Sequence, residues 1–145
     1  MAAEHTASAI WNGDLMGGSG TFSLGSGAAT DVGLTWRARA EDASAGTSPE
    51  ELIAAALASC FSMALAHGLA QAGTPSTRLD TSATATFDRT DEGFRVTNIA
   101  LTTRGQVDGL DEAGFREAAE GAKANCSVSK ALEGNVEITL DAALA

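Results

Sequence analysis

The stretch Ser48–Gly73, SPEELIAAALASCFSMALAHGLAQAG, carries the clearest structural signal in the sequence. Ser48 is a residue type that caps helices, Pro49 suits the first helical position, and Glu51 stands where a capping box needs an acid. Gly73 is typical of a helix end. Together these signals predict one helix of about 24 residues, which would be roughly 36 Å long.

The interior of this predicted helix is almost entirely Ala, Leu, Ile, Phe, Met and Ser, and it contains no Lys or Arg. A soluble helix that is apolar nearly all round is normally buried. Cys60, one of the two cysteines in the chain, lies at its middle. Because a 145-residue monomer does not easily cover such a helix, we expect a dimer.

The composition is that of a soluble globular protein. The length suffices for one core, so we expect residues 1–145 to form a single domain. The net charge of −10 and the pI near 4.4 argue against nucleic acid or an anionic membrane as partner, because both attract clustered Lys and Arg. The first residues contain acids and no basic region typical of a secretion signal, so we expect a cytoplasmic protein with no membrane span.

Short segments with alternating side chains precede the central helix. Residues 7–11, 20–24 and 33–40 are predicted as strands separated by Gly-rich turns. In the third of these strands, Arg37 and Arg39 would share the face opposite Trp36.

After Gly73, two further strands are predicted at residues 79–88 and 94–107, with a hairpin turn between them. The alternation slips near Asn98, which predicts a β-bulge. Asp111 can cap a second helix, which is followed by a short helical turn over Cys126–Leu132 and a last strand at Val136–Leu140. This order of elements predicts an α+β domain with a mostly antiparallel sheet packed on helices.

The two cysteines are candidate reactive groups, because a thiol reacts as its thiolate when its pKa is lowered. Cys60 has apolar neighbours, so burial would raise its pKa, and any activating cation must come from outside its helix, with Arg37 or Arg39 nearest in sequence. Cys126 lies in AKANCSVSK, near a helix start and two lysines, which favours a thiolate and partial exposure. A purely structural role stays open for both cysteines.

Glu50 lies ten residues before Cys60 in the predicted helix. That spacing is about 15 Å along the helix axis, so Glu50 does not reach the thiol of its own chain. It could reach the thiol of a second chain if two such helices cross antiparallel at their middles. The two histidines and two cysteines have no zinc-ligand spacing, and no phosphate-binding Gly-rich motif is present, so we expect no metal and no other cofactor.

The segments SPEELIAAALASCFSMALA and NCSVSKAL resemble the OsmC/Ohr family of thiol-dependent hydroperoxide reductases, and the OsmC branch more than the Ohr branch. The similarity extends from IWNGD through WRARAE to VEITLDAAL, which is nearly the whole chain. It implies an OsmC-like fold, with mostly antiparallel sheets packed on a long central helix and a second helix. It also implies an intertwined homodimer with active sites at the interface.

The resemblance implies a role for four residues. Cys60 is similar in position to the peroxidatic cysteine of the family and Cys126 to the resolving cysteine. Glu50 matches the active-site glutamate, and Arg39 matches the family arginine best, with Arg37 as the fallback. In the implied mechanism, Arg39, oriented by a bidentate pair with Glu50, stabilises a thiolate that attacks an organic hydroperoxide. The resulting sulfenic acid forms a disulfide with the second cysteine, and an external dithiol restores both thiols.

The resemblance also implies the partners: an organic hydroperoxide, a second copy of the chain, and a dithiol reductant, for which lipoyl proteins are the expectation from the Ohr branch. Phe61, Met63 and Trp36 would form an apolar pocket that favours organic peroxides over hydrogen peroxide. Two residues depart from the family pattern: Leu57 stands where many members have histidine, and Ser127 where proline usually follows the second cysteine. We expect these departures to change the pocket lining or loop stiffness and to leave activity intact.

Two other functions stay open. One is a non-catalytic dimer that binds an apolar ligand in the same pocket, with both cysteines as passive core residues. The other is a peroxide sensor that passes its oxidation state to a protein partner, although the sequence contains no DNA-binding element. The presence of both cysteines, an arginine and Glu50 favours the peroxidase.

Overall fold

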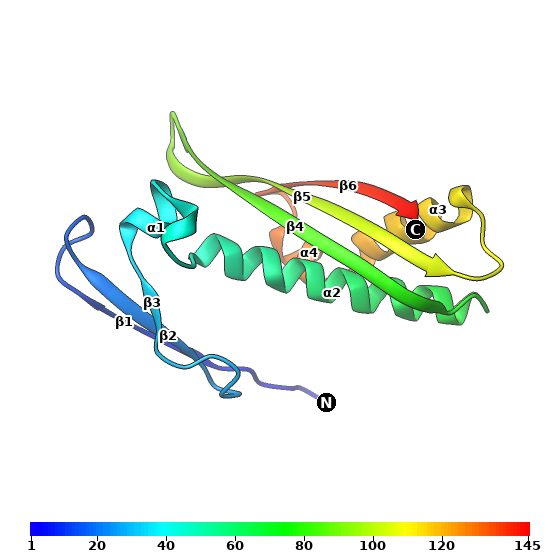
Figure 1. The fold of residues 1–145 in the computed structure, drawn as a ribbon, viewed down its shortest axis with the longest axis horizontal. Coiled ribbons are helices and arrows are strands. Elements are labelled where there is room, and N and C mark those ends of the chain that lie inside the picture. Colours follow the sequence, from blue (N-terminus) through cyan, green and yellow to red (C-terminus); the bar gives the residue numbers. More distant parts are fainter. The chain divides into compact units, whose positions relative to one another are not determined.

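The computed structural model describes all of residues 1–145. It divides into two compact units, residues 1–52 and 53–145, which are described in turn. The first unit contains three strands and two short helices, and the second contains three longer strands and two helices (Figure 1). The central helix α2 (Pro49–Gln71) begins in the first unit and continues through the second.

In the first unit, β1 (Ala7–Asn12), β2 (Ser19–Leu24) and β3 (Val32–Leu34) form one antiparallel sheet in that order. The first two strands confirm the sequence prediction to within one residue at each end. The third strand is shorter than the 33–40 predicted.

Residues 36–40 form a helix, α1 (Trp36–Ala40), in place of the predicted continuation of the third strand. The helix starts because the hydroxyl of Thr35 accepts a hydrogen bond from the backbone N–H of Ala38 at 3.1 Å. The prediction that Arg37 and Arg39 share a strand face was therefore wrong. An alternation of only a few residues does not distinguish a strand from a single helical turn. A 3-10 turn, η1 (Ala43–Ala45), follows.

Both predicted ends of α2 are confirmed. The side chain of Ser48 accepts a hydrogen bond from the backbone N–H of Glu51 at 3.1 Å, and the carboxylate of Glu51 accepts one from the hydroxyl of Thr47. At the other end Gly73 has a φ of 82°, a left-handed conformation that glycine adopts without strain.

In the second unit, β4 (Ser76–Thr90) and β5 (Gly93–Val107) form the predicted hairpin, and β6 (Glu137–Leu144) pairs with β5 in parallel. Thr86 pairs with Asn98 and Phe87 with Val96, so one extra residue lies on β5. This register shift confirms the bulge predicted near Asn98. The sheets are mostly antiparallel, and the one parallel pair arises because β6 returns to the sheet after two helices.

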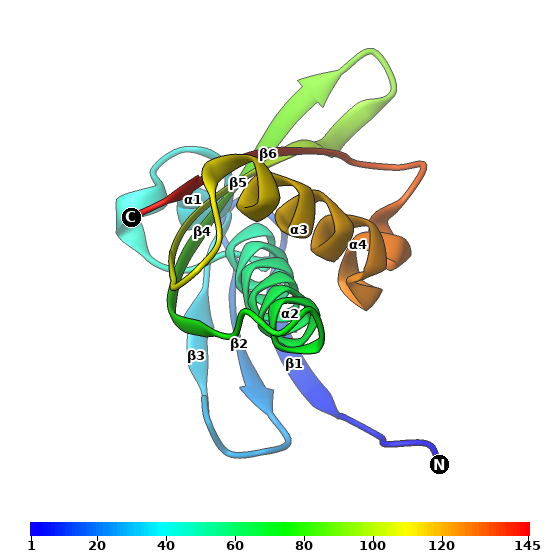
Figure 2. The same cartoon turned by 90° about the vertical axis from the view of Figure 1, so that its right-hand side faces the viewer.

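Those two helices are α3 (Glu112–Asn125) and α4 (Ser127–Leu132), both close to their predicted bounds. The carboxylate of Asp111 accepts a hydrogen bond from the backbone N–H of Gly114 at 2.8 Å and so caps α3 as predicted. Figure 2 looks along α2 and shows α3 running beside it, with the β4–β6 sheet covering both.

One side of α2 forms the core of the second unit. Its buried residues recur every four positions and pack against the sheet and α3, and they are Leu57, Phe61, Leu65 and Leu69. Burying a side chain of this size contributes about 1.5–3 kcal/mol. Phe115 of α3 lies directly over Gly105 of β5, where an added Cβ would come within 2.4 Å of its ring.

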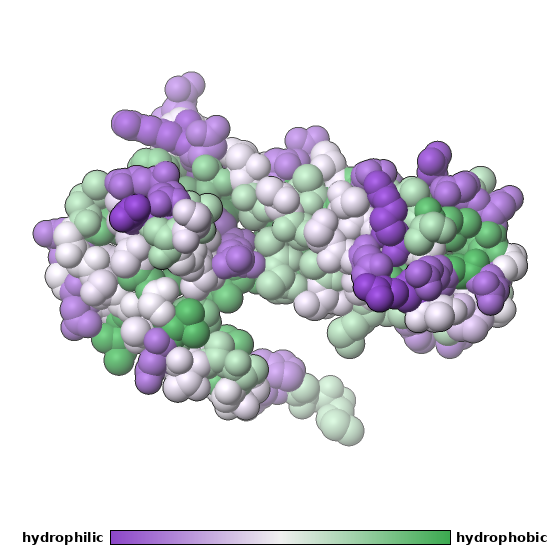
Figure 3. All heavy atoms as spheres, viewed as in Figure 1, coloured by the Kyte–Doolittle hydropathy of each residue, from purple (hydrophilic) through white to green (hydrophobic).

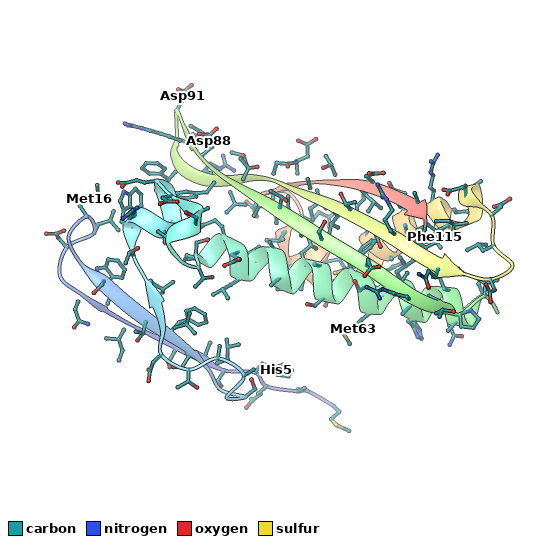
Figure 4. All side chains as sticks on the ribbon, in the orientation of Figure 1. His5, Met16, Met63, Asp88, Asp91 and Phe115 are labelled. Atoms are coloured by element: carbon teal, nitrogen blue, oxygen red, sulfur yellow. The ribbon has the colours of Figure 1, made fainter.

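The other side of α2 is apolar and exposed. Met63 is 74% exposed and projects from the helix away from β5 and β6 (Figure 4), and Ala55 and Ala56 are also exposed. In the hydropathy view this part of the surface is mostly white and pale green (Figure 3). By length and composition α2 could cross a membrane, a test that the core helix of a soluble protein also passes. The prediction of a buried helix therefore holds for one side of α2 in the single chain.

Candidate active site

The two cysteines lie together in the second unit, although they are far apart in sequence. Cys60 is on α2 and is partly exposed, whereas Cys126 stands between α3 and α4 and is 1% exposed. Both are free thiols, and their side chains are hydrogen-bonded to each other. A solvent-accessible thiol thus has a buried thiol as its direct neighbour.

Backbone hydrogen bonds fix Cys126 at the junction of α3 and α4. Its N–H donates to the carbonyl of Ala122 at 2.9 Å, which completes the last turn of α3. Its Sγ accepts a hydrogen bond from the N–H of Ser129 at 3.5 Å, so the cysteine is also the N-cap of α4. The side chain therefore points back between the helices and into the core, rather than outward.

The pKa of Cys60 is lowered from its ordinary value. Partial burial is the largest single influence and raises the pKa, but hydrogen bonds to the sulfur together outweigh it. These bonds come from the thiol of Cys126, from the hydroxyl of Ser127, and from the backbone N–H groups of Val128 and Ser127. The donors lie outside α2, as predicted, but they are neutral groups at residues 126–128 and were not among the candidates that the sequence suggested, Arg37 and Arg39.

The pKa of Cys126 is raised, because it is buried and because its proton is held in the hydrogen bond to Cys60. The prediction that Cys126 is partly exposed and favours a thiolate was therefore wrong. Neither of the two nearby lysines is among the groups that shift this pKa: Lys123 pairs with Glu120 at 2.9 Å, and Lys130 is exposed. The opposite shifts leave one thiol ready to ionise and its neighbour protonated.

In the first unit, Arg39 and Glu50 form a close ion pair. The Nε of Arg39 is 3.2 Å from both carboxylate oxygens of Glu50, and one terminal nitrogen is 2.9 Å from Oε1. Glu50 is 5% exposed, so its charge is buried against the guanidinium. Arg37, the fallback candidate, instead pairs with Asp42 on the surface, where its side chain is 69% exposed.

The predicted site residues therefore form two groups, Arg39 with Glu50 in residues 1–52 and Cys60 with Cys126 in residues 53–145. The predicted pocket lining needs correction. Phe61 is fully buried in the core and Met63 is exposed on the far side of α2, because side chains two positions apart on a helix face different ways. Leu57, which departs from the family pattern, is likewise a core residue.

A groove of about 630 Å³ lies between α2 and α3 in the second unit, lined by small residues and by His67, Glu117 and Asn125. Neither cysteine lines it. No cluster of three His, Cys, Asp or Glu side chains is placed to hold a metal ion. The candidate chemistry of the second unit is therefore that of the thiol pair.

Sequence reasoning missed Ser127 as a contact of the reactive thiol. Its Oγ lies 3.4 Å from the Sγ of Cys60. In the sequence, Ser127 stood out only because it replaces the proline that usually follows the second cysteine, and this replacement predicted no more than a change in pocket lining or loop stiffness. The contact becomes visible once α4 is placed against the middle of α2.

The sequence of the chain is similar to one protein family and to several characterised proteins. Residues 40–141 match the family described as OsmC-like protein. The chain is 43% identical over 141 residues to the peroxiredoxin OsmC of Escherichia coli K12, covering 97% of this chain and 96% of that protein. It is 31% identical over 117 residues to the organic hydroperoxide resistance protein OhrA of Bacillus subtilis, and the match covers 78% of this chain and 79% of that protein.

Solved structures agree on the fold. The crystal structure of OhrB of Bacillus subtilis superposes with a TM-score of 0.73 at 26% identity, covering 94% of this chain and 97% of that one. An OsmC protein from Legionella pneumophila superposes with a TM-score of 0.71 at 22% identity, and the match covers 98% of this chain and 99% of that one.

Proposed function

The chain belongs to the OsmC family, and from this premise we propose that it is a thiol-dependent peroxidase that reduces organic hydroperoxides to alcohols and hydrogen peroxide more weakly. The observation that carries the proposal is the thiol pair. Cys60 is accessible and has a lowered pKa, and Cys126 is buried, protonated and hydrogen-bonded to it. This is the asymmetry that a peroxidatic and a resolving cysteine need.

In the first step the Cys60 thiolate attacks the distal oxygen of the hydroperoxide. The O–O bond breaks, the sulfur is oxidised to a sulfenic acid, and the alkoxide takes a proton and leaves as the alcohol. Hydrogen bonds from residues 126–128 favour the thiolate that this step requires.

In the second step the Cys126 sulfur attacks the sulfur of the sulfenic acid. A disulfide forms, and the hydroxyl of the sulfenic acid leaves as water with the proton that Cys126 gives up. The contact between the two side chains means that little movement is needed for this step. An external dithiol then reduces the disulfide by exchange and is itself oxidised to a disulfide; a lipoyl protein is our candidate reductant.

We assign Arg39 to the stabilisation of the Cys60 thiolate, with Glu50 as the residue that orients it. The three hydrogen bonds of the pair fix the plane of the guanidinium, as a bidentate arrangement requires. Glu50 lies ten residues before Cys60 on the same helix, about 15 Å away along the axis. We therefore propose that the Arg39–Glu50 pair of one chain serves the thiol pair of a second chain.

The exposed side of α2 supports this homodimer. It is apolar, includes Met63 at 74% exposure, and contains no Lys or Arg. A surface of this kind is stable in water when a second apolar surface covers it. We propose that residues 1–145 act as a single OsmC-like domain within an intertwined, cytoplasmic homodimer, where a reducing environment keeps the two cysteines as thiols.

The two alternatives are less well supported. A passive ligand-binding protein does not need one accessible cysteine with a lowered pKa beside a second, protonated one. A pure sensor would need a slow return to the thiol state, which steady-state turnover with a dithiol would exclude.

The test is peroxide consumption by the purified protein with dithiothreitol as reductant, comparing cumene hydroperoxide with hydrogen peroxide. We expect continuous turnover with both and a higher kcat/KM for cumene hydroperoxide. A rate equal to that of dithiothreitol alone with both peroxides would contradict the proposed function.

A further inference from the structure

Ser127 is in contact with the sulfur of Cys60. Its Oγ lies 3.4 Å from the Sγ, within the range of a hydrogen bond to sulfur. Ser127 is exposed and Cys60 is partly exposed, so the contact is open to solvent. Where proline follows the second cysteine, as is usual in OsmC/Ohr sequences, that residue has neither a hydroxyl nor a backbone N–H to donate.

We propose that Ser127 is a further catalytic residue of this chain, whose hydroxyl donates a hydrogen bond to the Cys60 thiolate and stabilises it for attack. The inference rests on the proposed peroxidase function of Cys60. In the thiol form either atom can be the donor. A thiolate carries no proton, so in the reactive form the hydroxyl must donate to sulfur, and the contact stabilises the ionised state.

Other serines near Cys60 show that this contact differs from ordinary helix packing. The hydroxyls of Ser59 and Ser62 donate to the carbonyls one turn earlier in α2, those of Ala55 and Ala58. Such bonds are typical of serine inside a helix. The hydroxyl of Ser127 reaches across to another helix and bonds to the sulfur instead.

The hydroxyl of Ser127 is also not the cap of its own helix. The side chain of Cys126 accepts the hydrogen bond from the N–H of Ser129 and so caps α4. Removing the hydroxyl of Ser127 therefore leaves the α4 cap in place. The backbone N–H of Ser127 also donates to Cys60, so the residue provides two donors that can be removed one at a time.

Four variants separate these contributions. Ser127→Ala removes the hydroxyl alone, Ser127→Thr keeps it, and Ser127→Pro removes both donors. Proline suits the first position of a helix, and Cys126 before it has φ −59° and ψ 126°, which a following proline permits. Ser62→Ala is the matched control, because it removes a hydroxyl of α2 that bonds only to the carbonyl of Ala58.

The readout is the rate of Cys60 alkylation by iodoacetamide against pH, followed by peptide mass spectrometry so that Cys126 is counted separately. The midpoint gives the pKa of Cys60, and the plateau at high pH gives the reactivity of the thiolate itself. We expect the Ser127→Ala midpoint to move to higher pH, with the rate at neutral pH roughly three- to tenfold lower, as for the loss of one exposed hydrogen bond. Ser127→Pro should move it further, and Ser127→Thr and Ser62→Ala should match the wild type.

An unchanged midpoint in Ser127→Ala would overturn the inference, as would a shift of equal size in Ser62→Ala. A merely structural role would lower the plateau and leave the midpoint in place. If Ser127→Ala loses its cooperative thermal transition, Ser127→Gly removes the same hydroxyl and repeats the test. Turnover of cumene hydroperoxide, measured in parallel, distinguishes the two proposals. If the wild type is active and the Ser127→Ala midpoint is unchanged, only the role of Ser127 is refuted. If the wild type is inactive, the peroxidase function is refuted.

Discussion

Replacing Glu50 by glutamine tests the ion pair that we assign to the active site. The side chain keeps its size, but it loses its charge and one of the two acceptors that face Arg39 at 2.9–3.2 Å. A hydrogen bond between charged groups contributes about 1.5–3 kcal/mol. Because the Arg39 side chain is 36% exposed, we discount this to about 1–2 kcal/mol for the pair.

The assay is thermal unfolding by circular dichroism, together with peroxide turnover on the same samples. For a chain of this length, about 1–2 kcal/mol corresponds to a fall of about 2–8 °C in Tm. The matched control is Arg37→Lys, which alters the exposed pair with Asp42 and should cost less than about 0.5 kcal/mol, with turnover unchanged. Equal losses of Tm and turnover in the two variants would refute the assignment of Arg39 and Glu50.

Three further predictions follow from the thiol pair, the proposed dimer and the core. Because the pKa of Cys60 is lowered and that of Cys126 raised, alkylation at rising pH should label Cys60 first; labelling in the reverse order would contradict the assignment. Mixing a Cys60→Ser chain with a Glu50→Ala chain should restore about half of wild-type activity per heterodimer if each active site is shared between two chains. Sedimentation that shows only monomer at micromolar concentration would exclude a shared active site. Gly105→Ala should lower the free energy of unfolding by about 1–3 kcal/mol, because the new methyl group clashes with the Phe115 ring. A Tm equal to that of the wild type would show that the Phe115 ring moves to accommodate the methyl group.

The sequence predicted the parts of the fold that depend on local signals. The ends of α2 follow from Ser48 and Gly73, and the bulge near Asn98 follows from the slip in alternation. It failed at Trp36–Ala40, where a short alternating segment folds as a helix because Thr35 caps it. The parallel pairing of β6 depends on the path of the chain through α3 and α4, which local patterns do not encode.

For the site, the identities of the cysteines could be predicted from the motifs, but their environments could not. Cys126 has polar neighbours in sequence, yet its side chain is buried because it caps α4 and points into the core. The donors to Cys60 come from residues 126–128, so they depend on how α4 meets α2. The Arg39–Glu50 contact was expected from the resemblance to the family and is present in the structure; its part in catalysis stays a prediction.

A single turnover without reductant tests most directly whether Cys60 is the peroxidatic cysteine and Cys126 the resolving one. Reduced protein receives one equivalent of cumene hydroperoxide, and the products are identified by peptide mass spectrometry after rapid quenching. We expect one peroxide consumed per chain with a Cys60–Cys126 disulfide in the wild type, a sulfenic acid on Cys60 in Cys126→Ser, and no consumption in Cys60→Ser. Consumption by Cys60→Ser at the wild-type rate would contradict this assignment.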